Sequence, residues 1–134
     1  MTKSLIDLYD LAEHQGIEVY SIDTRKADSI SILSDGECAI GINPFMLEST
    51  ADEKVKLAHE IGHCETGAFY NEYSRFSLRS KCEHRANVWA IKKLIPKDEL
   101  INAYKKGCTD PWSLAEYFEV TEDFMRKALE YYSV

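Results

Sequence analysis

The chain has 134 residues, a size typical of one domain, and 45% of them are hydrophobic, which suits a packed core and excludes a disordered chain. Its net charge of -7 argues against binding to nucleic acid or to an anionic membrane, since both need a basic surface. No run approaches the roughly 20 apolar residues of a membrane span, and acidic residues interrupt the N-terminus where a secretory signal needs an apolar segment. We therefore expect a single cytoplasmic domain over residues 1–134, with no nucleic-acid or membrane partner.

The N-terminal half predicts one helix followed by a small antiparallel sheet. Apolar residues recur every three or four positions from Leu5 to Ala12, which is typical of an amphipathic helix, and Gly16 is placed to end it. Three short β-prone runs follow, at residues 17–22, 29–33 and 38–42. The Asp35-Gly36 step between the second and third runs is a strong hairpin signal.

The C-terminal half predicts helices only. Ser49 or Thr50 can cap a helix that runs to about Glu65, with Gly67 as its stop. The segments expected after it are a polar loop at 70–80 and helices at 81–95, 98–106 and 113–132, the last as one or two helices. This order predicts an α+β domain, with an N-terminal helix, a three-stranded antiparallel sheet and a helical bundle. We expect residues 109–134 to be a helical extension packed on this domain.

The strongest chemical signal is the run His59-Glu60-Ile61-Gly62-His63. On a helix, residues four apart lie on one face about one turn apart, so both imidazoles can bind one zinc ion. Glu60 is rotated about 100° from His59 and can instead act as a general base that accepts the proton of the attacking water. A catalytic zinc usually has three protein ligands, so the third must come from elsewhere in the chain.

Six side chains are candidates for the third ligand: Glu65, Glu72, Glu83, His84, Asp98 and Glu99. Glu83 shares a helical stripe with Ala86 and Ala90, whose small side chains would let two helices approach closely. His84 points about 100° off that stripe, so we favour Glu83. The same ligands can also accept cobalt, nickel or manganese.

Nearby polar side chains have possible supporting roles. Tyr70 or Tyr73, in the predicted loop, could donate a hydrogen bond to the oxyanion of the transition state, with ordinary packing as the alternative for each. Asn87, one turn past Glu83, either hydrogen-bonds near the site or lies on the solvated helix surface. The strand at 38–42 could pair with an extended substrate by strand addition.

The four cysteines are scattered, at positions 38, 64, 82 and 108, and form no CxxC pair. This pattern predicts four reduced and mostly buried thiols. Cys64 and Cys82 each adjoin a proposed ligand, but a role as small buried side chains is favoured over a role as extra ligands.

Taken together, the motifs resemble a known family. The run His59-Glu60-Ile61-Gly62-His63, followed by Glu83-x-x-Ala86-Asn87-x-Trp89-Ala90 and Leu94-Ile95-Pro96, is similar to the ImmA/IrrE metallopeptidases. Those proteins carry HExGH and then ExxAN-x-F-A-x-x-LL-x-P, so Trp89 stands where Phe is usual. The resemblance implies a minimal zincin, gluzincin-like fold, one zinc ion per chain held by His59, His63 and Glu83, and Glu60 as the catalytic base. It also implies a site-specific endopeptidase that cleaves a helix-turn-helix repressor of a phage or mobile element.

Two other functions compete with this one. A zinc-containing regulatory or interaction module would bind metal without cleaving a substrate, but a purely structural site has no use for Glu60. Residues 114–129 resemble a DNA-binding helix-turn-helix in their apolar spacing, yet Glu119 replaces the usual turn glycine. From Thr109 onward, acidic side chains also outnumber basic ones by six to two. We therefore expect this apolar stripe to pack on the domain rather than to serve DNA binding.

Overall fold

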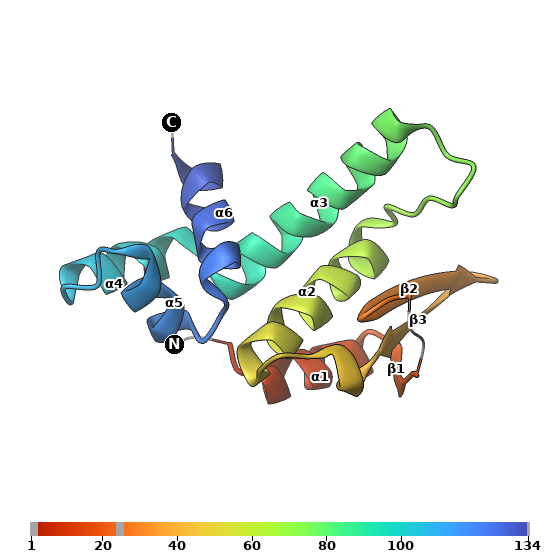
Figure 1. Ribbon diagram of the computed structural model, residues 1–134, viewed down its shortest axis with the longest axis horizontal. Helices are drawn as coiled ribbons and strands as arrows, with labels where there is room; N and C mark the ends of the chain where they lie inside the picture. The colour runs from red at the N-terminus through yellow and green to blue at the C-terminus, as the bar shows by residue number, and fades with distance from the viewer. Residues whose placement is uncertain (1–2, 24–25, 134) are drawn as a thin grey trace.

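The computed structural model describes residues 3–23 and 26–133. In chain order, the elements are α1 (Leu5–His14), β1 (Glu18–Ser21), β2 (Ser29–Ser34), β3 (Glu37–Ile42), the short 3-10 helix η1 (Pro44–Met46), α2 (Thr50–Thr66), α3 (Phe76–Leu94), α4 (Lys97–Lys105), α5 (Pro111–Phe118) and α6 (Glu122–Tyr132). Helix α2 lies between α3 on one side and the sheet with α1 on the other, and α4 to α6 gather at one end of the α2–α3 pair (Figure 1). The predicted α+β class, with its N-terminal helix and three strands, is confirmed.

The sheet is mixed rather than wholly antiparallel. Strands β2 and β3 form the predicted hairpin around Asp35 and Gly36, which both have positive φ. Strand β1, however, pairs in parallel with the other side of β3, which gives the order β1-β3-β2. The antiparallel prediction is therefore wrong for β1. Strand β3 carries the buried Ile40 and Ile42, and this most buried strand takes the central position, where both of its sides are paired.

Strand β2 is consequently an edge strand. Within the described part of the chain, only one of its sides pairs with another strand. The prediction that residues 38–42 offer a free edge to a substrate is wrong, because that strand is β3, at the centre of the sheet. Among the described residues, the two edge strands of the sheet are β1 and β2, and β2 is the edge strand that packs against α2.

Helix α2 has the boundaries that its sequence indicates. Ser49 is the N-cap, and its hydroxyl accepts a hydrogen bond of 3.0 Å from the amide of Asp52. Gly67 ends the helix in the left-handed conformation, with φ of 68°. One face of the helix buries Leu57 and Ile61 in the main hydrophobic core.

Helix α3 begins earlier than predicted, at Phe76 rather than at about Lys81. Its first turn gives little signal in the sequence, because no side chain caps it and Phe76 is 83% exposed. Glu83 therefore lies in the third turn of α3 instead of the first. The two helices approach closely at Gly62, where an added Cβ would lie 2.7 Å from the carbonyl oxygen of Ala86. Only glycine fits at this crossing.

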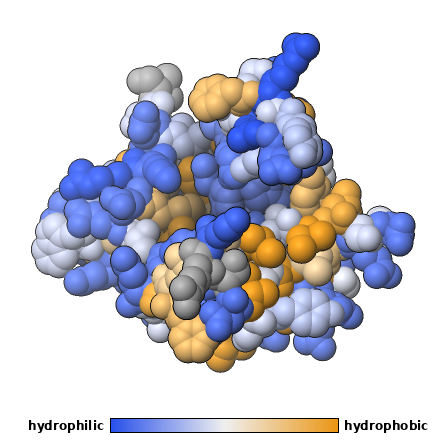
Figure 2. Space-filling model, turned by 45° about the vertical axis from the view of Figure 1, so that its right-hand side comes forward, coloured by the Kyte–Doolittle hydropathy of each residue, from blue (hydrophilic) through white to orange (hydrophobic). Residues whose placement is uncertain are grey.

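The C-terminal helices share the hydrophobic core with the rest of the chain. Phe124, Met125 and Ala128 of α6 belong to the same buried cluster as the core residues of α1 and α2. Glu119, between α5 and α6, adopts the left-handed conformation with φ of 56°, in the place where glycine is usual. Hydrophilic side chains cover most of the face seen in Figure 2, and apolar ones gather in its lower part. None of the helices in the described residues is long and apolar enough to cross a membrane.

Lys54 is a buried cation that the sequence pattern did not indicate. The residue is 2% exposed, and its ammonium group donates a 2.6 Å hydrogen bond to the carbonyl oxygen of Phe118, the last residue of α5. This bond ties α2 to α5 and satisfies a carbonyl that the end of α5 leaves without a partner. Burial lowers the pKa of Lys54 below its ordinary value.

We expect Lys54→Ala to lower the free energy of unfolding by about 2–4 kcal/mol, because it opens a cavity and leaves the Phe118 carbonyl without its donor. Urea unfolding measures the loss, and Lys54→Met, which keeps most of the volume, should lose less. Since the folded pKa of Lys54 is below 10.5, the folded protein loses this proton at a lower pH than the unfolded chain does. The stability of the wild type relative to Lys54→Met should therefore rise as the pH climbs toward 10.5. If the difference in the free energy of unfolding between the wild type and Lys54→Met does not change with pH, the ammonium group of Lys54 is not buried.

Two of the four cysteines are joined. Cys38 of β3 and Cys64 of α2 form a disulfide, with their Cα atoms 5.8 Å apart. The prediction of four reduced thiols is therefore wrong for this pair, while Cys82 and Cys108 are free. The pair has no signature in the sequence, because 26 positions separate the two cysteines and only the packing of α2 on β3 brings them together.

Candidate metal centre

Three side chains from two helices converge on one point. Nε2 of His59 lies 2.7 Å from Oε2 of Glu83, Nε2 of His63 lies 3.2 Å from the same oxygen, and the two Nε2 atoms are 3.2 Å apart. In a tetrahedral site with metal–nitrogen bonds of about 2.0–2.1 Å, neighbouring ligand atoms are about 3.3 Å apart. The three atoms therefore have nearly the spacing that a single zinc ion requires of its ligands.

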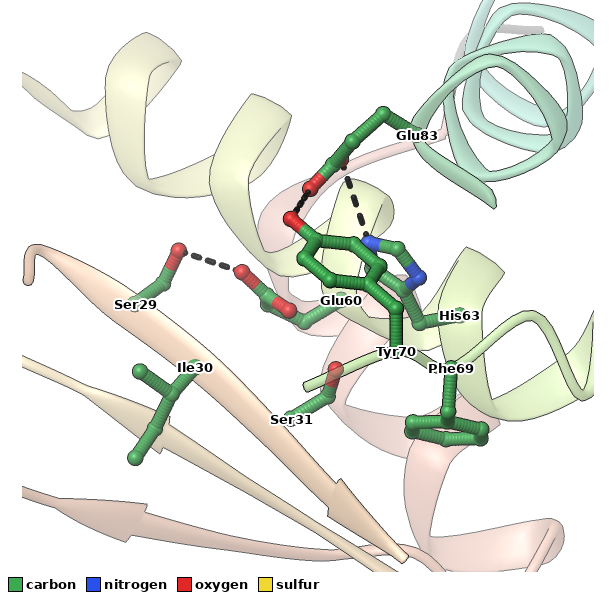
Figure 3. Close-up of a pocket in the computed structure, with 8 residues that line it drawn as sticks. All are labelled: Ser29, Ile30, Ser31, Glu60, His63, Phe69, Tyr70 and Glu83. Atoms are coloured by element: carbon green, nitrogen blue, oxygen red, sulfur yellow. Dashed lines mark hydrogen bonds and ion pairs between the residues drawn. The ribbon is translucent and has the colours of Figure 1, made fainter. Parts of the chain in front are cut away.

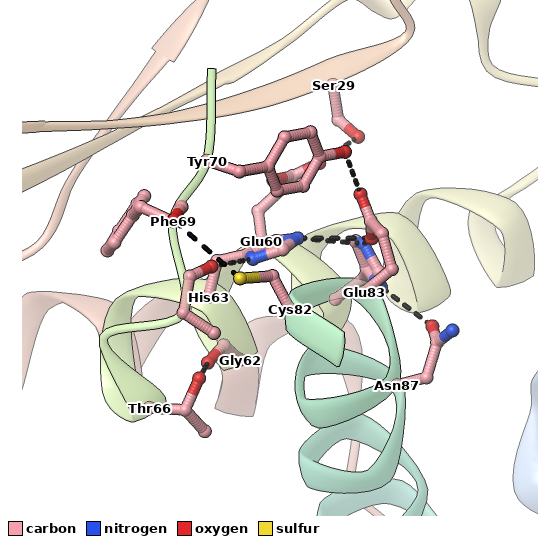
Figure 4. Close-up of polar contacts among 12 residues, drawn as sticks. Ser29, Glu60, Gly62, His63, Thr66, Phe69, Tyr70, Cys82, Glu83 and Asn87 are labelled. Atoms are coloured by element: carbon pink, nitrogen blue, oxygen red, sulfur yellow. Dashed lines mark hydrogen bonds and ion pairs between the residues drawn. The ribbon is translucent and has the colours of Figure 1, made fainter. Parts of the chain in front are cut away.

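The protein also orients the two imidazoles (Figure 4). Nδ1 of His63 lies 2.6 Å from the carbonyl oxygen of Ala68, and because a carbonyl only accepts, Nδ1 donates. Nδ1 of His59 likewise lies 2.8 Å from Oδ1 of Asn87. Both Nε2 atoms are then left with lone pairs that face the carboxylate of Glu83. A shared proton or a metal ion between these groups would offset the repulsion of the facing lone pairs, and two imidazoles with one carboxylate form a ligand set that suits zinc.

Tyr70 holds the third of these side chains in place. It comes from the segment between α2 and α3, and its hydroxyl donates a 2.5 Å hydrogen bond to Oε1 of Glu83, so that Oε2 faces the imidazoles. This bond, with burial and the carboxylate charge, raises the pKa of Tyr70 to about 12 and keeps the hydroxyl protonated. Burial acts to raise the pKa of Glu83, but the Tyr70 hydroxyl and the imidazoles of His59 and His63 lower it overall. Tyr73 is 86% exposed and is not among the residues that line the cavity beside these side chains.

Glu60 lies beside the cluster rather than in it. The residue is 6% exposed, and its Oε2 accepts a 2.7 Å hydrogen bond from the hydroxyl of Ser29, at the start of β2. The two residues line a cavity of about 230 Å³ that also borders His63 and Glu83 (Figure 3). The carboxylate therefore sits between the edge strand and the ligand cluster, where a base can reach a water molecule that attacks a bound peptide. Nothing in the sequence links Ser29 to Glu60.

A second and wider groove, of about 620 Å³, opens on the other side of the same cluster. It is lined by His59, Glu60 and Glu83 on the side of the cluster and by Asp123, Phe124 and Lys127 of α6 on the opposite side, among others. Lys56, within this groove, makes ion pairs of 2.7 Å with Asp28 and 2.9 Å with Asp52. The first turns of α6 thus form one wall of a groove that leads to the candidate metal centre.

The other candidates for the third ligand lie elsewhere. Within the residues that the structure describes, the group of His, Cys, Asp or Glu side chains able to hold a metal ion is His59, His63 and Glu83. His84 is exposed on α3 and lines a different hollow, with Ile91 and Tyr131. Glu65, Glu72, Asp98 and Glu99 are also outside the group. Cys82 is buried with its sulfur 3.7 Å from the carbonyl oxygen of Phe69, which agrees with a role as a small buried side chain.

A helix that carries HExGH, a carboxylate from the neighbouring helix and a sheet edge beside Glu60 are together typical of metallopeptidases. The family model described as the IrrE N-terminal-like domain, peptidase family M78, matches residues 12–130. The chain therefore belongs to this family, and the resemblance to the ImmA/IrrE metallopeptidases is confirmed. A comparison with curated proteins found no match.

Proposed function

We propose that the chain is a zinc-dependent endopeptidase, with one zinc ion held by His59, His63 and Glu83. One observation carries this proposal: two lone-pair nitrogens and one carboxylate oxygen converge on one point. A hydrogen bond at the opposite side of each imidazole or carboxylate group holds it in this orientation. When bound there, zinc supplies Lewis acidity, which polarises a peptide carbonyl and lowers the pKa of water.

The other side chains around the centre transfer protons or hold the ligands in position. Glu60 takes a proton from the attacking water and passes it to the leaving amine, and the hydrogen bond from Ser29 aims its carboxylate. Asn87 and the Ala68 carbonyl hold the imidazoles in the tautomer that binds metal. Tyr70 acts here as a positioning residue on Glu83. To serve as an oxyanion donor, its hydroxyl would have to leave that carboxylate.

The substrate that fits this arrangement is an extended segment of a protein. The edge strand β2 lies beside Glu60. A peptide paired with β2 would cross the ligand cluster from the cavity beside Ser29 to the wider groove along α6. The resemblance to ImmA/IrrE proteins supports a helix-turn-helix repressor of a phage or mobile element as that protein. Because strand pairing needs an extended backbone, we expect the scissile bond in a loop or linker of the repressor rather than inside one of its helices.

The second candidate is a non-proteolytic regulatory or interaction module that uses the same zinc site. It is favoured less, because such a module has no need of a buried carboxylate poised between the ligands and a sheet edge. Metal analysis of the purified protein, followed by incubation with the repressor encoded beside its gene, separates the two functions. Stoichiometric zinc with no cleavage of any neighbouring repressor would favour the module.

We expect Glu83→Ala to lose most of the bound zinc, because it removes one of three ligands, whereas His84→Ala on the exposed side of the same helix should keep it. Zinc per chain, measured by plasma mass spectrometry after dialysis, reads out both variants. Circular dichroism checks that each is folded. If His84→Ala loses zinc and Glu83→Ala keeps it, the third ligand is His84 rather than Glu83.

A further inference from the structure

The disulfide joins two parts of the molecule that border the candidate metal centre. Cys64 follows His63 in the last turns of α2, and Cys38 lies in β3 opposite Leu33 of the edge strand β2. The bond thus links the helix that carries two proposed ligands to the sheet that carries the edge beside Glu60. Both cysteines are only partly buried, unlike the free Cys82, which is 4% exposed.

We propose that Cys38 and Cys64 are a reversible redox pair that exchanges with a low-molecular-weight disulfide such as glutathione disulfide. One cysteine thiolate attacks glutathione disulfide, forms a mixed disulfide and releases one glutathione thiolate. The second cysteine thiolate attacks the mixed disulfide, closes the Cys38–Cys64 bond and releases the second glutathione. The protein gives up two electrons and two protons, and glutathione disulfide becomes two glutathione thiols. Reduced glutathione drives the reverse reaction.

The pair controls how firmly the end of α2 is held. In the oxidised form, the last turn of the helix is bonded to β3, and with it the segment through Gly67 to Ala68, whose carbonyl orients His63. Reduction leaves only non-covalent packing at this end of α2. Local opening of the helix end then becomes more frequent, and His63 loses its hydrogen bond to the Ala68 carbonyl more often. The redox pair itself goes beyond the proposed function, whereas this effect on the metal rests on the proposed zinc site.

Thiol counting tests the pair directly. The full chain is equilibrated with glutathione disulfide, alkylated in denaturant and weighed by mass spectrometry. We expect two alkylated thiols, those of Cys82 and Cys108, and four after prior reduction. Four alkylated thiols before reduction would overturn the proposal.

A double-mutant cycle shows whether the bond, and not the packing of each side chain, matters. In oxidised protein, Cys38→Ala, Cys64→Ala and the double variant should each lower the thermal midpoint by a similar amount, about 10 °C, since either change removes the bond. Cys82→Ala keeps the bond and serves as the control for removal of a thiol, because its midpoint should still fall on reduction. If the loss in the double variant equals the sum of the single losses, the two cysteines act independently and the proposal fails.

Zinc release measures the consequence for the metal. A colorimetric chelator should take zinc from reduced wild type on the order of tenfold faster than from oxidised wild type, as when an orienting group of a ligand is loosened. Cys38→Ala should release zinc at the fast rate in both conditions. Equal rates from the two wild-type forms would overturn the effect on the metal. A chain that binds no zinc in either form contradicts the proposed function instead, and the thiol counts and midpoints still decide the redox pair.

Discussion

Replacing Glu60 with glutamine should abolish peptide-bond cleavage without changing the zinc content. Glutamine has nearly the same shape and can still accept the hydrogen bond from Ser29, so the cavity beside β2 should keep its form. It cannot take up the proton of the attacking water, and the loss of a general base costs about 10²–10⁴-fold in rate. Cleavage of the proposed repressor substrate is followed by mass spectrometry, and zinc per chain is measured on the same sample.

The matched control for this variant is Glu65→Gln. Glu65 lies on the same helix but is exposed and outside the ligand group, so its variant should keep both zinc and cleavage. If Glu60→Gln cleaves at the wild-type rate, Glu60 is not the base. If it loses zinc together with activity, Glu60 contributes to the metal site itself, and the division of roles between Glu60 and Glu83 is wrong.

Gly62→Ala should weaken both the fold and the metal site. At an exposed helical position this change stabilises a protein by about 1 kcal/mol, because alanine is the better helix former. At this crossing, however, the new Cβ would lie 2.7 Å from the backbone oxygen of Ala86, so α3 must move away from α2. We expect a loss of about 1–3 kcal/mol in the free energy of unfolding, the usual cost of overpacking.

The shift of α3 should also carry Glu83 away from His59 and His63. Glu83 precedes Ala86 by about one turn, so a displacement of α3 at the crossing also displaces the Glu83 carboxylate. We expect zinc affinity to fall by at least about tenfold. Competition with a chelator measures the affinity, and urea unfolding of the metal-free protein measures stability. Glu65→Ala is the control for a new alanine on the same helix. A rise in stability for Gly62→Ala would contradict the close helix crossing.

The helix that carries the candidate site could be predicted because its signals are local. Ser49 and Gly67 mark its ends through contacts within four residues, and the spacing of His59 and His63 places them on one face whatever surrounds the helix. The sequence favours Glu83 for a similar reason, since its stripe with small residues indicates a close helix–helix contact. The exact start of α3 was missed, because no side chain caps its N-terminus.

The sequence contains no local signal for the contacts between segments that are distant along the chain. The parallel pairing of β1, the bond between Cys38 and Cys64, and the hydrogen bond from Ser29 to Glu60 each depend on how the sheet docks against α2. Periodicity shows which face of an element is buried but not which partner covers it. Local composition and spacing are therefore enough to predict the helix that carries His59 and His63 and the class of fold. The edge strand beside Glu60, the wall that α6 adds to the groove and the disulfide come from long-range packing, which no short stretch of the sequence encodes.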